Sequence, residues 1–134
     1  MARTDKYLQQ ALYETLHADA SLTALMGGNK VFSQIALNTE FPFILICNWR
    51  SEDWSTSSDN GELHHFDFEI WDDAASSLLR QNLGSRIYEL LHEQSLELDF
   101  GHLVNLRFEN SFLSVQDHTK LQPLRLKFRA AIEF

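Results

Sequence analysis

The strongest constraint on the fold is a strict alternation of residue types in two separate stretches of the chain. In the first stretch, His64, Phe66, Phe68 and Ile70 alternate with His65, Asp67, Glu69 and Trp71. In the second, Leu124, Leu126, Phe128, Ala130 and Ile132 alternate with Arg125, Lys127, Arg129 and Ala131. Successive side chains of a β-strand point to opposite faces, so each stretch predicts a strand with one covered face. This pattern favours an antiparallel sheet that is covered on one side.

Other segments predict the rest of the sheet less sharply. Strands are predicted at residues 43–49 and 104–109, while residues 31–41 are ambiguous and fit a short strand followed by a loop. Residues 50–61 are polar and end in the turn pair Asn60-Gly61, so we expect a surface loop between two antiparallel strands. Residues 110–122 are expected to be a strand end and a polar connection.

Helices are predicted at both ends of the strand-rich centre. Residues 5–18 have the apolar spacing of a helix, with Thr4 as its N-cap. Asp19 is expected to cap a short second helix that stops at Gly27-Gly28, because glycine tolerates the left-handed geometry of a helix end. A third helix is expected to begin after an N-cap at Asp72-Asp73 and to run to about Glu93. Gly84 inside it would allow close approach to the sheet.

These elements predict an α+β fold that spans residues 1–134 as a single domain. The sheet is expected to be antiparallel or mixed, with about four to five strands and with helices packed on one face. Nothing in the sequence, such as an internal repeat or a low-complexity linker, suggests a division of the chain.

Charge and cysteine content exclude several classes of protein. The formal net charge of −8 argues against general or sequence-specific nucleic-acid binding, which needs a basic surface. No apolar run approaches the roughly 18 residues of a membrane helix, and the N-terminus lacks the apolar stretch of a secretory signal. Cys47 is the single cysteine and follows apolar residues, so we expect its side chain to be buried. With no second cysteine for a disulfide, we expect the protein to occupy a reducing compartment.

The sequence contains no recognisable catalytic, cofactor or metal site. His64 and His65 are adjacent in a strand, point to opposite faces and therefore cannot chelate one ion together. The other four histidines lie in separate elements, and no GxSxG elbow or phosphate-binding glycine loop is present. We therefore expect no catalytic residues, no cofactor and no metal ligands.

The distribution of charge is the more informative feature. Residues 1–102 carry 6 basic and 16 acidic side chains, whereas residues 103–134 carry 5 basic and 3 acidic ones. Asp67 and Glu69 could pair across the sheet with Arg125, Lys127 and Arg129 of the same chain. Alternatively, the acidic edge of one subunit could meet the basic face of the next. Trp54, in the polar loop, could fold back over the core or be an exposed interface anchor.

Several short motifs, taken in order along almost the whole chain, resemble a family of phage tail-completion proteins. These are the tail terminators of long-tailed phages and of gene transfer agents. The matching motifs are Leu8-Gln-Gln-Ala-Leu-Tyr13, Ala18-Asp-Ala-Ser-Leu-Thr-Ala-Leu25, Gly27-Gly28, Val31-Phe32, Phe41-Pro-Phe43, Asp53-Trp-Ser-Thr-Ser57, Gly61-Glu62, Ile70-Trp71, His102-Leu-Val-Asn-Leu-Arg-Phe108 and Leu126-Lys-Phe-Arg-Ala130. The connection Gln116–Gln122 matches least well.

The resemblance implies a structural subunit, not an enzyme, that is made in the bacterial cytoplasm and incorporated into a virion tail. It implies a homo-oligomeric, hexameric ring that caps the tail tube and contacts the tube protein and the head or neck connector proteins. No cofactor belongs to that role. The candidate partner-binding residues are Trp54, Asp67, Glu69, Arg125, Lys127 and Arg129. Two alternatives are a small hydrolase with an acid or Cys centre, and a small-molecule or regulatory binding module with an enclosed pocket.

Overall fold

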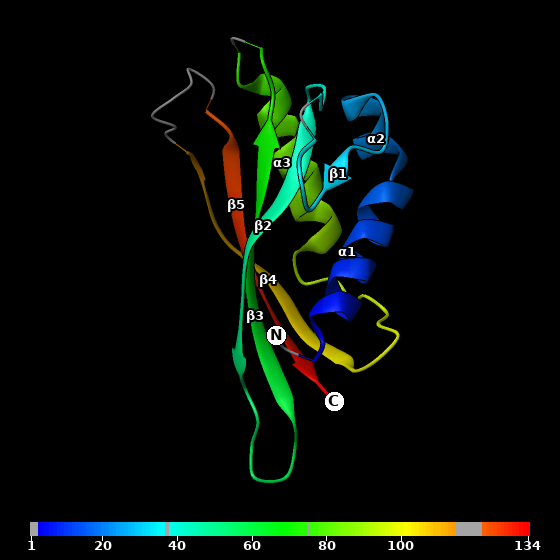
Figure 1. Cartoon of the computed structure of the whole chain (residues 1–134), viewed down its shortest axis with the longest axis vertical. Coiled ribbons are helices and arrows are strands. Elements are labelled where there is room, and N and C mark those ends of the chain that lie inside the picture. Colours follow the sequence, from blue (N-terminus) through cyan, green and yellow to red (C-terminus); the bar gives the residue numbers. More distant parts are fainter. Residues whose placement is uncertain (1–2, 37, 75, 115–121) are drawn as a thin grey trace.

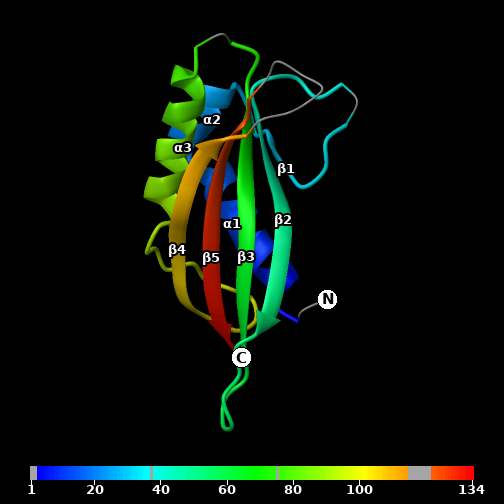
Figure 2. The same ribbon diagram turned by 90° about the vertical axis from the view of Figure 1, so that its left-hand side faces the viewer.

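A computed structural model describes residues 3–36, 38–74, 76–114 and 122–134. The elements are α1 (Asp5–Ala18), α2 (Ala20–Met26), β1 (Val31–Phe32), β2 (Phe43–Asp53), β3 (Gly61–Trp71), α3 (Leu78–Leu91), β4 (His102–Leu113) and β5 (Leu124–Glu133). The strands form one five-stranded sheet in the order β1-β2-β3-β5-β4. The three helices lie on one face of this sheet, and the other face is free of helices (Figures 1 and 2). We call the face away from the helices the outer face.

The sheet is mixed, because β1 pairs with β2 in parallel while the remaining neighbours are antiparallel. The predicted α+β class is therefore confirmed, and residues 31–32 resolve the ambiguity over 31–41 in favour of a short strand. The part of the predicted 110–122 connection that falls on residues 115–121 lies outside the described residues.

The first two helices begin and end for largely local reasons. The carboxylate of Asp19 accepts a hydrogen bond from the backbone N–H of Leu22 over 2.8 Å, which confirms the predicted cap of α2. Gly27 ends α2 with φ of 74°, in the left-handed region. Thr4 occupies the position before α1, but its side chain makes no cap there. Its hydroxyl instead contacts Glu62 and His64 on β3.

The β2–β3 hairpin is longer than the sequence predicts. Residues 50–53 pair with residues 62–65 of β3, so the prediction of a loop over 50–61 is wrong for its first part. The strands are thereby extended, and the remaining loop of residues 54–60 projects beyond the end of the sheet (Figures 1 and 2). A bulge between Cys47 and Arg50, with Asn48 at φ of 54°, shifts the register along β2.

The third helix starts later than predicted. Its N-cap is Ser77, not Asp72-Asp73, and it ends at Leu91 instead of about Glu93. Asp72 is buried, and the guanidinium of Arg80 donates to the backbone carbonyl of Asp72 over 3.5 Å. Gly84 does face the sheet closely, since a Cβ added there would lie 3.0 Å from Cδ2 of Leu124. The predicted reason for this glycine is therefore confirmed.

The core lies between the sheet and the three helices. Phe66, Phe68 and Phe128 are at most 1% exposed and pack ring against ring with centroids 5.5 to 6.0 Å apart. Burying each such ring stabilises the fold by about 1.5–3 kcal/mol. Cys47 departs from its prediction, because it is only half-buried on the outer face.

The described ends of the chain meet beside the hairpin. The guanidinium of Arg3 lies 5.3 Å from the ring centroid of Phe134. The backbone N–H of Phe134 donates to the carbonyl of Asn60, in the hairpin loop, over 3.0 Å. Both ends are therefore held close to the base of the projecting loop (Figure 1).

Candidate assembly surfaces

The acidic residues of the outer face are largely neutralised within the chain. Asp67 and Glu69 on β3 are only 5% and 6% exposed. Arg125, one strand away on β5, forms an ion pair with Glu69 and lies 3.6 Å from the carboxylate of Asp67. The amide of Asn48 donates to Asp67 over 3.0 Å. These contacts match the intramolecular alternative, in which acidic side chains of β3 pair with basic side chains of β5 in the same chain.

The acidic neighbour Glu69 raises the pKa of Arg125. Partial burial alone would lower this pKa, but the hydrogen bond and attraction to Glu69 outweigh burial and raise it. The guanidinium therefore stays protonated, and the charge of Arg125 is used in ion pairs within its own chain.

Lys127 and Arg129 have no such acidic partner among the described residues. Arg129 is exposed, and Lys127 is half-buried with its ammonium 6.0 Å from the ring centroid of Phe112 on β4. Lys127 pairs in register with Asp67, but no ion pair joins their side chains. Of the three predicted basic residues, the structure therefore ties one to the acids and leaves two available at the surface.

A row of basic side chains crosses the outer face. Arg50 on β2 lies opposite His65 on β3, His65 lies opposite Arg129 on β5, and Arg129 lies opposite Arg107 on β4. Directly paired residues point to the same face of a sheet, so these four side chains form one line across it. We call this line the basic row. Arg50 and Arg107 were missed by the sequence analysis, which predicted Arg50 to be in a loop.

Not every member of the basic row is equally free. His65 lies between two carboxylates, 3.4 Å from Glu52 and 3.5 Å from Glu109. Arg107 forms an ion pair with Glu93 over 3.0 Å while its side chain remains 46% exposed. Arg50 and Arg129 are exposed and make no ion pair with any residue that the structure describes. The uncompensated charge of the row therefore lies on Arg50 and Arg129.

The projecting loop and Asp53, the last residue of β2, form an acidic tip, which we define as residues 53–60. It contains Asp53 and Asp59 and no Lys or Arg. Trp54 lies at its base and is 41% exposed, so the structure puts it at the surface and not in the core. Gly61 is required here, because an added Cβ would lie 2.8 Å from the carbonyl oxygen of Trp54.

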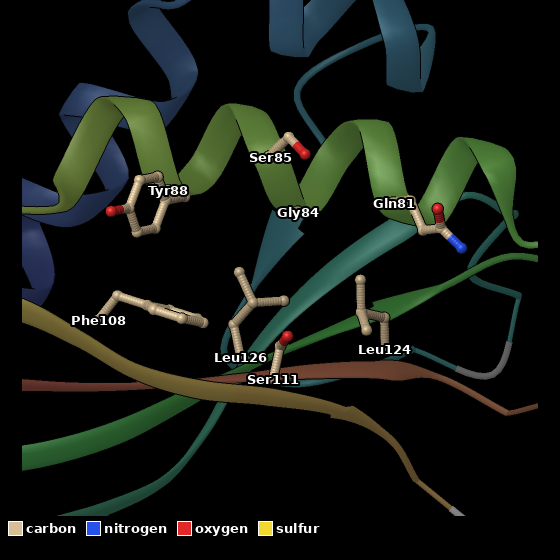
Figure 3. A pocket seen from close by; sticks show the side chains of 8 residues that line it. All are labelled: Gln81, Gly84, Ser85, Tyr88, Phe108, Ser111, Leu124 and Leu126. Carbon is tan, nitrogen blue, oxygen red and sulfur yellow. The ribbon is translucent and has the colours of Figure 1, made fainter.

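An apolar groove lies on the helix-covered face of the sheet, between α3 and the strands β4 and β5 (Figure 3). Its volume is about 250 Å³. Figure 3 shows Leu124, Leu126 and Phe108 below the helix, with Gly84 and Ser85 above them. None of the described residues that line it is charged, so these residues offer neither an acid nor a base for chemistry.

One buried cluster has the residue types of a hydrolytic triad. The hydroxyl of Thr4 lies 2.8 Å from Nε2 of His64, and a carboxylate oxygen of Asp5 lies 3.3 Å from Nδ1. Thr4 and His64 are 0% exposed, and the Thr4 hydroxyl donates to Glu62 over 2.6 Å. A substrate therefore has no access to this hydroxyl, and the cluster joins the start of α1 to β3.

Burial and hydrogen bonding shift the pKa values of this cluster. Burial lowers the pKa of His64 and raises the pKa of Asp5. For Glu62, burial alone would raise the pKa, but hydrogen bonds from the Thr4 hydroxyl and the Arg3 backbone outweigh it and lower the pKa. The folded chain therefore favours the neutral form of the His64 imidazole.

The remaining candidates for chemistry are weak. Burial raises the pKa of the Cys47 thiol to about 12, so its reactive thiolate is scarce near neutral pH. Across the described ranges, no three His, Cys, Asp or Glu side chains are grouped so that they could hold a metal ion. The helices in those ranges are too short or too polar to traverse a bilayer.

Comparison with known proteins gives a consistent family and fold. The profile of the family described as "Tail completion protein gp17" matches residues 10–133. A chain of the virion of a native gene transfer agent (GTA) particle is similar at 25% identity and a TM-score of 0.90, and the match covers 100% of both chains. The gp17 protein of bacteriophage SPP1 shares the fold at 22% identity and a TM-score of 0.60, over 93% of this chain and 88% of that one. No curated protein sequence matches the chain.

Proposed function

Because the chain belongs to the tail completion protein gp17 family, we propose that it caps the tail tube of a phage or gene-transfer-agent particle. In this role, copies of the chain close into a hexameric ring at the head-proximal end of the tube. One face of the ring stops tube growth, and the other receives the head or neck connector proteins. The subunit would be made in the bacterial cytoplasm and end in the virion tail.

The observation that carries this proposal is the full-length likeness to a chain of a gene transfer agent virion. That likeness extends over all the elements, including the hairpin that projects from the sheet (Figure 1). The role is geometric and needs no reaction or cofactor. It is consistent with a triad-like cluster that is closed to substrate and with a groove whose described lining residues are uncharged.

Of the predicted partner-binding residues, we propose that Trp54, Lys127 and Arg129 contact neighbouring molecules in the particle. Trp54 and Arg129 are exposed, and Lys127 has no ion pair among the described residues. We assign Asp67, Glu69 and Arg125 a supporting role, since their mutual ion pairs hold the outer face in shape. Partly exposed aromatic and basic side chains are common anchors of protein interfaces.

The proposal is tested by tail assembly with and without the chain. Tube protein from the same particle should grow to irregular lengths alone and should stop, with a ring at one end, when the chain is added. In producing cells, loss of the chain should leave tails that lack heads, and these are counted by electron microscopy. Tubes of unchanged length in the first assay, together with joined particles in the second, would reject the proposed role.

A further inference from the structure

We propose that the acidic tip of one copy docks on the basic row of the next copy in the ring. This inference rests on the proposed function, because it names the contact through which neighbouring subunits would join. It replaces Asp67 and Glu69, the acidic residues suggested by the sequence, with Asp53 and Asp59 of the tip.

The outer face retains unpaired positive charge. Glu69 and Asp67 are occupied by Arg125, and Glu52 and Glu109 lie against His65. Arg50 and Arg129 remain exposed without an acidic partner among the described residues. In a chain of net charge −8, two such arginines on one sheet face mark a surface suited to an acidic partner.

The tip carries the opposite charge in a rigid form. The backbone N–H of Thr56 donates to the carbonyl of Asp59 over 2.8 Å. The Thr56 hydroxyl accepts from the backbone N–H of Asp59 over 3.1 Å. At the base, Ser55 Oγ accepts from the backbone N–H of Gly61 over 3.0 Å. These bonds fix the loop before it binds, which lowers the entropy lost on docking.

The tip cannot reach the basic row of its own chain. Gly61 begins β3 at the base of the tip, and His65 lies four residues farther along the strand. At a rise of about 3.3 Å per residue, this separates the base of the tip from the row by about 13 Å. The tip points away from the sheet (Figure 2), so the two surfaces can meet only between molecules.

The receiving surface has space for an aromatic side chain. A hollow of about 530 Å³ lies on the outer face between Arg50, Glu109 and Lys127. Trp54 at the base of the tip is 41% exposed and could enter this hollow, where Arg50 and Lys127 would lie close to its ring. Because the two complementary surfaces differ, repeated contacts run head to tail and can close into a ring.

The test is an exchange of charges between the two surfaces. One variant carries Asp53→Lys and Asp59→Lys, a second carries Arg50→Glu and Arg129→Glu, and a third carries all four changes. Each two-residue variant should reduce the fraction of tube ends that carry a ring by about tenfold or more. The four-residue variant should recover most of that loss, because it restores opposite charges at the contact.

The matched control for the first variant is Glu14→Lys with Glu40→Lys, which makes the same charge change at exposed positions outside both surfaces. It should form rings at the level of the unaltered chain, and all variants should keep the unaltered melting temperature. Normal rings from both two-residue variants would overturn the contact and leave the proposed function intact. A loss that the four-residue variant does not recover would also overturn it. Failure of the unaltered chain to form rings on tubes would reject the proposed function itself.

Discussion

The indole N–H of Trp49 donates a hydrogen bond to Nδ1 of His64 over 3.1 Å. This bond requires an unprotonated Nδ1, so the proton of the neutral ring lies on Nε2, facing the Thr4 hydroxyl. The chain of donors then runs from Trp49 to His64, to Thr4 and to Glu62. Neutral His64 completes this chain, whereas a protonated ring would lose the bond from Trp49.

Stability should therefore fall as the solution becomes mildly acidic. Burial lowers the pKa of His64 in the folded chain, while an unfolded histidine titrates at about pH 6.5. Between these two pKa values the unfolded chain binds more protons, so the free energy of unfolding is highest above about pH 6.5 and declines below it. Urea unfolding at a series of pH values measures this slope.

The slope should be smaller in His64→Gln, whose amide does not titrate and can still accept from Trp49. Asp5, whose pKa is raised, and Glu62, whose pKa is lowered, face this position in both proteins, so the difference between the two slopes over about pH 7 to 5.5 reports the histidine. An equal slope in both proteins would contradict the assignment.

Removing the Thr4 hydroxyl should destabilise the fold. Thr4→Val keeps the shape but removes the hydroxyl beside the buried Nε2 of His64 and one of the hydrogen bonds to Glu62, at a cost of about 1–3 kcal/mol in the free energy of unfolding. Thr39→Val, at an exposed site where the hydroxyl donates to the carbonyl of Ala36, is the control and should cost less. Chemical denaturation compares the two, and equal costs would count against a structural role for the network.

The two arginines of β5 should separate folding from assembly. Arg125→Glu removes the partner of Glu69 and sets like charges beside it, so it should lower the free energy of unfolding by about 1–3 kcal/mol. Arg129→Glu changes an exposed side chain and should change it by no more than about 0.5 kcal/mol. Thermal melts of both variants decide this; similar losses of stability would contradict the different roles.

Enlarging Gly84 should strain the contact between α3 and the sheet. In Gly84→Leu the new side chain meets Leu124 and Leu126, and overpacking of this kind costs about 1–3 kcal/mol. Ser85→Leu, at the exposed neighbouring position, is the control and should be tolerated. The melting temperatures of both variants test this, and an unchanged value for Gly84→Leu would show that the helix can move away freely.

Cys47 should be a slow nucleophile. Burial raises the pKa of its thiol to about 12, so alkylation by iodoacetamide near pH 8 should be far slower than that of a free cysteine. Tail capping should be unaffected in Cys47→Ala. Fast labelling of the folded chain, or loss of capping in the variant, would contradict the view that this thiol has no chemical role.

Elements set by local signals were predictable from the sequence. The Asp19 cap, the left-handed Gly27 and the alternation around Phe66 each follow from a few neighbouring residues. Elements set by distant partners were not. Ser51, Glu52 and Asp53 have the composition of a loop, yet β3 holds them in a strand. Thr4 looks like a helix cap, but its hydroxyl bonds to residues about 60 positions away.

The candidate surfaces follow the same division. Alternation alone placed Arg125 and Glu69 on one face, and the structure pairs them. The basic row needed the register between four strands, which depends on the bulges beside Asn48 on β2 and along β4. Arg50 follows such a bulge, so its face could not be counted from the residues before it. Only a prediction that the strand continues through residues 50–53 could have placed Arg50 on the sheet.

The meeting of Arg3 with Phe134 beside the projecting loop has a practical consequence for anyone who labels this protein. An affinity tag or fluorescent domain fused to either terminus would be delivered to the same corner of the subunit, and would crowd whatever the loop touches. A label inserted at the exposed start of α3, near Leu78, lies at the other end of the molecule (Figure 1) and avoids this interference.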